Sequence, residues 1–400
     1  MLCGIRVEFL IFGALLLGIA VLHRRALTCA LLGLIALVAF ELASGGLREG
    51  PGLAGLAGHF ANEWAVLANL FALLLGFVLL ARHFELSAVP AVLSRVLPDG
   101  WKGGFVLLLM IFVMSSFLDN IAAAVIGGTM ASTVFRNRVH IGFLAAIVAA
   151  ANAGGAGSVI GDTTTTMMWI EGVPARDLLH AYIAAGVAFI FFAVPAALQQ
   201  QRFAPMVRDA HPNVRVDSGR VACVAFILIS AVAVNLLVNL HWPQHAEDFP
   251  FLGAGVWLAI LLTAPLRRPA WGLLPEAARG ALFLVTLVAC ASLMPVSALP
   301  KASWTTTLGL GFLSSVFDNI PLTKLALDQG GYDFGFLAYA VGFGGSMLWF
   351  GSSAGVALST QFPEARSVGA WLKHGWHVGL AYIIGFLALF AFLDWHPRAT

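Results

Sequence analysis

The chain has 400 residues, of which 60% are hydrophobic and only 10% are charged, and its net charge is +2. Soluble domains carry about 25% charged residues, so this composition excludes an ordinary soluble protein and predicts many membrane-spanning helices in a lipid bilayer. So small a net charge gives no reason to expect a nucleic-acid partner.

The cysteines give no sign of a resident cofactor or metal. None lies in a CxxC sequence or at a Cys/His ligand spacing, so we expect small buried apolar side chains and no cofactor. The four cysteines are Cys3, Cys29, Cys223 and Cys290.

A helix needs about 20 apolar residues to cross a bilayer. Segments of this kind are predicted at about 7–22, 26–45, 62–81, 141–170, 178–199, 219–240, 251–266, 279–298, 335–361 and 375–393. The first of them has no basic start and no clear cleavage site, so we expect a retained helix rather than a signal peptide. The expected fold is an all-α polytopic membrane protein with about ten transmembrane helices.

Two further apolar segments are interrupted in their middle. Residues 103–135 and 303–327 each carry an Asp-Asn pair between two halves that are too short to span. Each segment therefore predicts a re-entrant hairpin, since irregular backbone at membrane depth is tolerated only where protein or water covers it.

The basic residues favour this arrangement. With the N-terminus outside and both hairpins returning to their own side, most arginine and lysine residues fall inside, as the positive-inside rule requires. The basic residues left outside are Arg6, Arg48, Arg176, Lys301 and Arg398. The two hairpins then enter from opposite sides, as an inverted-topology repeat demands.

The two hairpins carry copies of one sequence, Ser-Ser-x-x-Asp-Asn-Ile. The first copy runs from Ser115 to Ile121 and the second from Ser314 to Ile320. An ionisable residue at membrane depth costs about 2.5–3.5 kcal/mol on insertion scales. Two such aspartates, Asp119 and Asp318, therefore predict an ion or substrate site at the interface of two repeats.

Each hairpin is followed by a long apolar span that is broken in its middle. Both broken spans, 141–170 and 335–361, contain Gly-Gly, five residues and another Gly, and the first also carries an intramembrane acid, Asp162. Glycine weakens a helix and admits positive φ. Exposed carbonyls and half-helix ends at such breaks can coordinate ions.

These features divide the chain into four parts. We expect N-terminal scaffold helices at 1–60, a first repeat at 61–200, a cytoplasmic linker at 201–218 and a second repeat at 219–400. The linker is the longest polar stretch and marks the boundary between the repeats.

The segments resemble the signature sequences of the NhaD-type sodium/proton antiporters. The matching stretches are 118–120, 151–156, 160–170, 318–322 and 344–357. That family belongs to the ion-transporter superfamily, which includes arsenite permeases and dicarboxylate and citrate carriers. The resemblance covers about 55–395 and implies a homodimer in the cytoplasmic membrane that exchanges Na⁺ or Li⁺ for H⁺ by an elevator movement.

Carboxylate, amide and hydroxyl oxygens suit hard cations. Asp119 and Asp162 are the predicted main carriers of cation and proton, and Asp318 is the third. The neutral ligands or positioning residues are predicted to be Asn120, Asn152, Ser158, Thr163, Thr164, Asn319 and Ser352. Secondary candidates are Ser115, Ser116, Ser315, Glu63 and Lys324.

Some secondary candidates leave two roles open. Ser115 and Ser116 lie on the Asp119 face of a helix, either as further ligands or as hydrogen-bond donors to its carboxylate. Glu63 falls where the family carries an acidic residue before its third span. Lys324 stands where the family pattern has an apolar residue, and it either extends to the outer surface or pairs with Asp318.

Two other functions remain as alternatives. Anion carriers of this superfamily present neutral groups and helix N-termini at the hairpin tips, so aspartate at both tips favours a cation over a dicarboxylate, citrate or arsenite.

An intramembrane aspartic enzyme would use Asp119 and Asp318 as a dyad, but it has no use for duplicated broken spans. We therefore expect a transporter and no enzyme.

Overall fold

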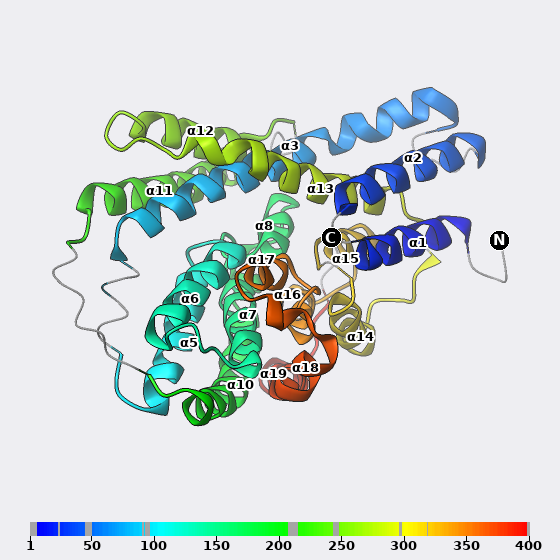
Figure 1. The fold of residues 1–400 in the computed structure, drawn as a ribbon. Coiled ribbons are helices and arrows are strands. Elements are labelled where there is room, and N and C mark those ends of the chain that lie inside the picture. Colours follow the sequence, from blue (N-terminus) through cyan, green and yellow to red (C-terminus); the bar gives the residue numbers. More distant parts are fainter. Residues whose placement is uncertain are drawn as a thin grey trace. The chain divides into compact units, whose positions relative to one another are not determined.

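The computed structural model describes residues 6–22, 25–44, 50–89, 92, 97–206, 215–242, 248–295, 298–317 and 319–397. All regular secondary structure in these residues is helical (Figure 1). The α-helices of the first half are α1 (Val7–Val21), α2 (Ala26–Ser44), α3 (Gly52–Leu86), α5 (Trp101–Ser115), α6 (Asn120–Val134), α7 (Ile141–Gly155), α8 (Thr163–Ile170), α9 (Ala175–Leu178) and α10 (Ala181–Phe203).

The second half is helical in the same way. Its helices are α11 (Ser218–His241), α12 (Phe251–Thr263), η4 (Trp271–Leu273), α13 (Leu274–Ser292), α14 (Trp304–Ser314), α15 (Asn319–Gln329), α16 (Phe334–Gly344), η6 (Gly345–Met347), α17 (Ser353–Gln361), η7 (Pro363–Arg366), α18 (Val368–His374) and α19 (Trp376–Leu393). The predicted all-α class is confirmed.

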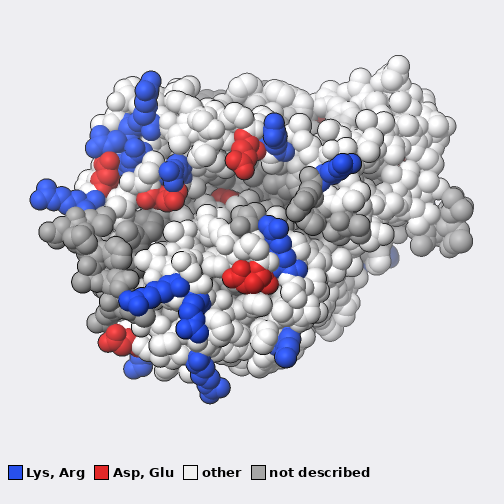
Figure 2. All heavy atoms as spheres, in the orientation of Figure 1, with Lys and Arg blue, Asp and Glu red and all other residues white. Residues whose placement is uncertain are grey.

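Five helical segments of the described chain are long and apolar enough to cross a membrane. They are Ala26–Ser44, Gly52–Leu86, Ala175–Phe203, Trp271–Ser292 and Trp376–Leu393. Further apolar helices of 10–17 residues accompany them. Figure 2 shows charged side chains scattered over part of the face drawn, while another part of that face carries none. These features agree with a multi-pass membrane protein.

The helices break where the sequence predicts interruptions. Residues 116–119 separate α5 from α6, and 156–162 separate α7 from α8. In the second half, α14 ends before α15 begins, and residues 348–352 lie between η6 and α17. The return of each hairpin to its own side of the membrane stays a prediction.

Close packing explains the glycines at the breaks. A Cβ on Gly154 would lie 2.0 Å from the Phe112 carbonyl oxygen, and one on Gly344 would lie 2.3 Å from the Gly311 carbonyl oxygen. Neither glycine has a positive φ. These glycines therefore let the broken helix approach the preceding hairpin, and they do so without left-handed backbone.

The chain forms two compact units, each drawing on both halves of the sequence. Unit 1 comprises residues 1–80, 225–300 and 320–329, and unit 2 comprises 81–224, 301–319 and 330–400. In unit 1, α2 packs against α1 and α13. In unit 2, α10 packs against α19, α7 and α5, α6 packs against α17, and α14 packs against α16.

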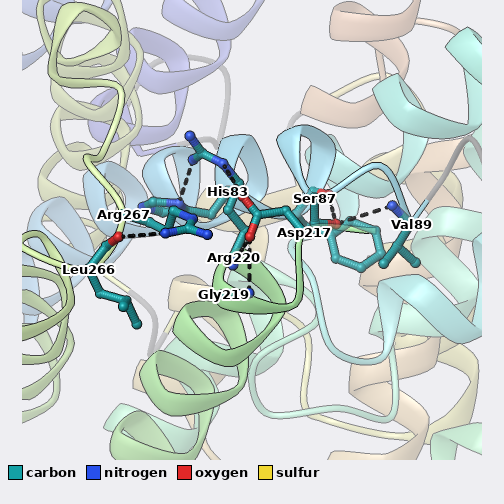
Figure 3. A network of polar contacts seen from close by, with 9 residues as sticks. His83, Ser87, Val89, Asp217, Gly219, Arg220, Leu266 and Arg267 are labelled. Carbon is teal, nitrogen blue, oxygen red and sulfur yellow. Dashed lines mark hydrogen bonds and ion pairs between the residues drawn. The ribbon is translucent and has the colours of Figure 1, made fainter. Parts of the chain in front are cut away.

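A polar network in unit 2 anchors the chain between α10 and α11 (Figure 3). The Asp217 backbone N–H donates to the Ser87 carbonyl oxygen at 2.9 Å. Arg220 places Nη1 3.0 Å from Nδ1 of His83 and Nε 3.6 Å from the Asp217 carboxylate. The end of the predicted linker at 201–218 is therefore fixed to the end of α3, while residues 207–214 lie outside the described chain.

Candidate cation site

Five polar side chains meet inside unit 2, where three interrupted segments come together. This polar cluster consists of Asn120, Asn152, Asp162, Ser346 and Ser352. All five are buried, and Asp162 is only 1% exposed. The cluster therefore lies in a region of low dielectric constant, where each polar group needs a partner.

Two asparagines connect the members of the polar cluster. The Asn120 amide donates to Asp162 Oδ1 and to Asn152 Oδ1, each at 3.1 Å. The Asn152 amide in turn donates to Ser346 Oγ at 2.9 Å and to Ser352 Oγ at 3.1 Å. The carboxylate of the first broken span is thus linked through amides to the hydroxyls of the second.

Helix N-termini position the acidic groups. Asp119 precedes α6 and accepts a hydrogen bond from Ile121 N at 3.2 Å, while Asp162 precedes α8 and accepts one from Thr164 N at 3.3 Å. Ser352 caps α17 in the same way. The positive ends of α6 and α8 stabilise the ionised carboxylates, because partial positive charge gathers at a helix N-terminus.

Asp119 and Asp162 form a pair of neighbouring acids. Asp119 is buried and close enough to Asp162 for the two charges to interact, and the Thr163 side chain lies beside it. The Asp119 Oδ1 atom has no hydrogen-bond partner in the described part of the chain. The described groups that interact with Asp119 include no lysine, arginine or histidine. Two acidic side chains therefore lie close together in one buried region.

Thr164 adds a hydroxyl at the same place. Its Oγ1 atom is buried and has no hydrogen-bond partner among the described residues. A Cβ built on Gly342 would lie 3.0 Å from Asp162 Oδ2 and 3.8 Å from Thr164 Oγ1. Gly342 therefore makes room for these two side chains, and Thr164 is placed to offer an oxygen to the ligand that Asp162 binds.

The first two serines of the hairpin donate to backbone carbonyls. Ser115 Oγ donates to the Ala151 carbonyl at 2.5 Å, and Ser116 Oγ donates to the Gly154 carbonyl at 3.0 Å. These hydrogen bonds hold the end of α5 to α7. The described bonds are thus not the ones to the Asp119 carboxylate that the second of the two predicted roles requires, and the role as further ligands stays a prediction.

Two serine candidates donate to backbone carbonyls, whereas the predicted roles of Asn319 and Asp318 stay predictions. Ser158 Oγ donates to the Ser116 carbonyl at 2.7 Å, and Ser315 Oγ donates to the carbonyl three residues before it at 2.6 Å. Both serines stabilise backbone at a break. Asn319 is buried at the start of α15. Asp318 lies outside the described residues, so its predicted role stays a prediction.

The site residue that sequence reasoning missed is Ser346. It follows Gly344 and Gly345 in the second broken span, and its hydroxyl accepts from Asn152 across the two halves of the chain. The signal that could have found it was its place directly after the glycine pair, beside a predicted helix break.

Lys324 and Glu63 belong to unit 1, where they form an ion pair. Lys324 Nζ is 3.0 Å from Glu63 Oε2 and 3.0 Å from Asp328 Oδ1. The residue is 2% exposed, so the prediction that Lys324 extends to the outer surface is wrong. The buried ammonium instead lies between two carboxylates.

Comparisons with known proteins agree with the motifs. The chain is 28% identical over 332 residues to Sodium/proton antiporter 1 of Arabidopsis thaliana, a match that covers 70% of this chain and 54% of that protein. It is 27% identical over 310 residues to the Na(+)/H(+) antiporter NhaD of Vibrio parahaemolyticus, covering 64% and 72% of the two chains. A second NhaD, from Alkalimonas amylolytica, is 27% identical over 307 residues.

The matches differ in how much of each relative they include. The chain spans about half the length of the Arabidopsis protein and nearly three quarters of the Vibrio protein. No profile of a known protein family matches it. The agreement of independent antiporters with the motifs confirms the resemblance. The chain is a relative of the NhaD-type sodium/proton antiporters.

Proposed function

We propose that the protein exchanges Na⁺ or Li⁺ for H⁺ across the cytoplasmic membrane. The observation that carries this proposal is the pair of buried acids, Asp119 and Asp162, in a site built from oxygen and amide groups. Two neighbouring buried carboxylates attract a cation or a proton. The names of the relatives, which are sodium/proton antiporters, support the same choice.

Competition at these carboxylates would couple the two ions. A protonated carboxyl group has no charge to offer a cation, and a carboxylate that binds Na⁺ is stabilised against protonation. Asp162 would bind the cation with the help of the Thr164 hydroxyl, while Asn120 and Asn152 would hold the carboxylate and the serine hydroxyls in place. Exchange then needs no covalent chemistry.

The donor set favours a hard cation. Carboxylate, amide and hydroxyl oxygens suit Na⁺ and Li⁺, whereas thiolate and imidazole suit the softer transition metals. Among the described residues, no group of three or more His, Cys, Asp and Glu side chains could hold a metal ion. We propose Na⁺ and Li⁺ as the transported cations.

Anion transport is the second candidate, and one observation favours it. The N-termini of α6, α8 and α17 all lie at the site, and helix N-termini are common anion-binding places. Two of these three ends, however, are already capped by the carboxylates of Asp119 and Asp162. A dicarboxylate anion would be repelled there, so cation exchange remains our proposal.

Alternating access by an elevator movement fits the division of the chain. All described members of the polar cluster belong to unit 2. If unit 2 carries the ion and unit 1 serves as the scaffold, the cluster stays intact throughout the cycle. The inverted repeat, the homodimer and the outside position of the N-terminus belong to this proposal on the strength of the resemblance.

Reconstitution into liposomes tests the proposal. A pH-sensitive dye inside the liposomes should report proton movement when NaCl or LiCl is added outside, and KCl should give no response. Counterflow of labelled succinate and of arsenite in the same liposomes tests the second candidate. Proton movement with Na⁺ and no counterflow supports exchange, whereas counterflow without a Na⁺ response would replace it by anion transport.

A further inference from the structure

A buried charge triad connects α15 to α3 within unit 1. It consists of Glu63, Lys324 and Asp328. Lys324 Nζ donates to Glu63 Oε1 at 3.2 Å and lies 3.0 Å from Oε2 and 3.0 Å from Asp328 Oδ1. The ammonium group thus contacts three carboxylate oxygens, from two helices.

The three side chains of the triad are largely shielded from solvent, so each charge depends on its partners. The lysine side chain is 3% exposed, and those of Glu63 and Asp328 are 17% and 15% exposed. A buried ion pair gains little over apolar packing, but removal of one partner leaves an uncompensated charge and is strongly destabilising. Such a pair therefore specifies one arrangement of two helices more than it adds stability.

The arrangement that the triad specifies is the position of α15. This helix begins at Asn319, in the second Asp-Asn-Ile sequence, and its residues from Ile320 onward belong to unit 1 with α3. A second attachment lies at its other end, where Gln329 Nε2 donates to the Pro300 carbonyl at 2.7 Å. Contacts at Lys324 and at Gln329 thus hold α15 to other parts of unit 1.

We propose that Lys324 is a positioning residue: the charge triad holds α15 to α3, and thereby sets the position of Asn319, the predicted ligand at which α15 starts. In this proposal Lys324 acts through the helix and is not itself a ligand of the transported cation. The inference rests on the proposed exchange only for its effect on cation affinity.

A charge swap tests this role. Glu63→Lys and Lys324→Glu each break the triad, whereas the double variant restores an opposite-charge pair between positions 63 and 324 and leaves Asp328 beside the new carboxylate. We expect each single variant to lower Tm and to raise the half-saturating Na⁺ concentration at least about tenfold, with a smaller change in maximal rate. The double variant should recover most of both losses but not all, and Lys324→Arg should stay close to the wild type.

Two controls make the result decisive. Lys301→Gln makes a neutral substitution at an exposed lysine and should change neither value. If the swapped protein does not fold, the cycle of Glu63→Gln, Lys324→Gln and their combination replaces it, and the combination should be less impaired than Lys324→Gln alone. Additive effects in that cycle would overturn the proposal.

The outcomes also separate this inference from the proposed function. A swapped protein with wild-type Tm and a half-saturating Na⁺ concentration as high as in the single variants would show that the charge at position 324 itself matters, which overturns the positioning role. A wild type without any Na⁺ response would end the proposed exchange. The Tm values of the same variants would still test whether the triad holds α15 to α3. If the Tm change of the double variant equals the sum of the two single changes, the residues do not interact and the triad has no such role.

Discussion

The two halves of the chain break their helices in the same way. In the first half, Ser115 donates from the end of α5 to the Ala151 carbonyl of α7 at 2.5 Å. In the second, Ser314 donates from the end of α14 to the Val341 carbonyl of α16 at 2.7 Å. In both halves, the first glycine of the Gly-Gly pair packs against a carbonyl of the hairpin arm. The backbone frame of a break is therefore common to the two halves.

The side chains within that frame differ. When the two Gly-Gly sequences are aligned, Ser352 stands at the position of Asp162, and Gly342 stands at the position of Asn152. The first half thus contributes a carboxylate and an amide where the second contributes a hydroxyl and an open space, into which Asp162 extends. The comparison teaches that the fold of the break is repeated while its charge is not.

The largest effect is expected at Asp162. Asp162→Asn keeps the shape of the side chain but removes the negative charge, and loss of a buried charge partner costs about 3–5 kcal/mol. Even the lower value weakens cation binding about 100-fold, since about 1.4 kcal/mol is a factor of ten. Na⁺-driven proton movement in liposomes should fall at least that far, while Glu364→Gln, at an exposed acid, should leave it unchanged. Exchange at the wild-type rate in Asp162→Asn would refute the role of the first half.

The next effect is expected at the residue that joins the halves. Asn152→Ala leaves the Ser346 and Ser352 hydroxyls without their amide partner, and a buried unsatisfied polar group costs about 1–3 kcal/mol. Both Tm and Na⁺ affinity should fall. Asn69→Ala is the matched control, because Asn69 is a buried asparagine of unit 1 that accepts from Gly253 N at 2.9 Å. That control should lower Tm alone, and an equal loss of affinity in both variants would contradict a local effect.

A smaller effect on Na⁺ affinity is expected at Gly342, which leaves space for the Asp162 side chain. Gly342→Ala would place a methyl group 3.0 Å from Asp162 Oδ2, and overpacking costs about 1–3 kcal/mol. The half-saturating Na⁺ concentration should rise at least about fivefold. Gly309→Ala on α14 makes the same change where no atom lies within 4 Å of the new methyl group, and it should have no such effect. Identical behaviour of the two variants would remove Gly342 from the site.

The smallest effect concerns the frame that both halves share. Ser115→Ala and Ser314→Ala each remove one buried hydrogen bond between helices, worth about 1 kcal/mol of net stability. Thermal unfolding should show similar decreases in Tm for both. The half-saturating Na⁺ concentration should stay within about twofold of the wild type, because neither hydroxyl belongs to the polar cluster. A large loss of affinity in either variant would make that serine a ligand instead.

Much of the fold could be predicted because membrane helices leave strong signals. Apolar length located the helices, and Asp119 and the Gly-Gly pair at Gly154 located the breaks within a few residues. The start of α3 at Gly52 was missed, since the glycines at 52, 55 and 58 each weaken a helix and made residues 52–61 resemble a loop.

The site could be predicted only in part. Residue type and position identified Asn120, Asn152, Asp162 and Ser352, which the structure brings together. The roles of the serine hydroxyls were harder to predict. A serine at a helix break can bind a ligand or donate to a backbone carbonyl, and the packing of helices far apart in sequence decides which of the two it does. The pairing of Lys324 with Glu63 could not be foreseen for the same reason, since 261 positions separate them.

Equilibrium binding of ²²Na⁺ to the purified protein tests most directly whether the first half carries the charge of the cation site. The account predicts saturable binding to the wild type, none to Asp162→Asn, and weaker but saturable binding to Ser352→Ala, in which only a neutral group is lost. Binding to Asp162→Asn with wild-type affinity would contradict the account, as would loss of binding in Ser352→Ala while Asp162→Asn still binds.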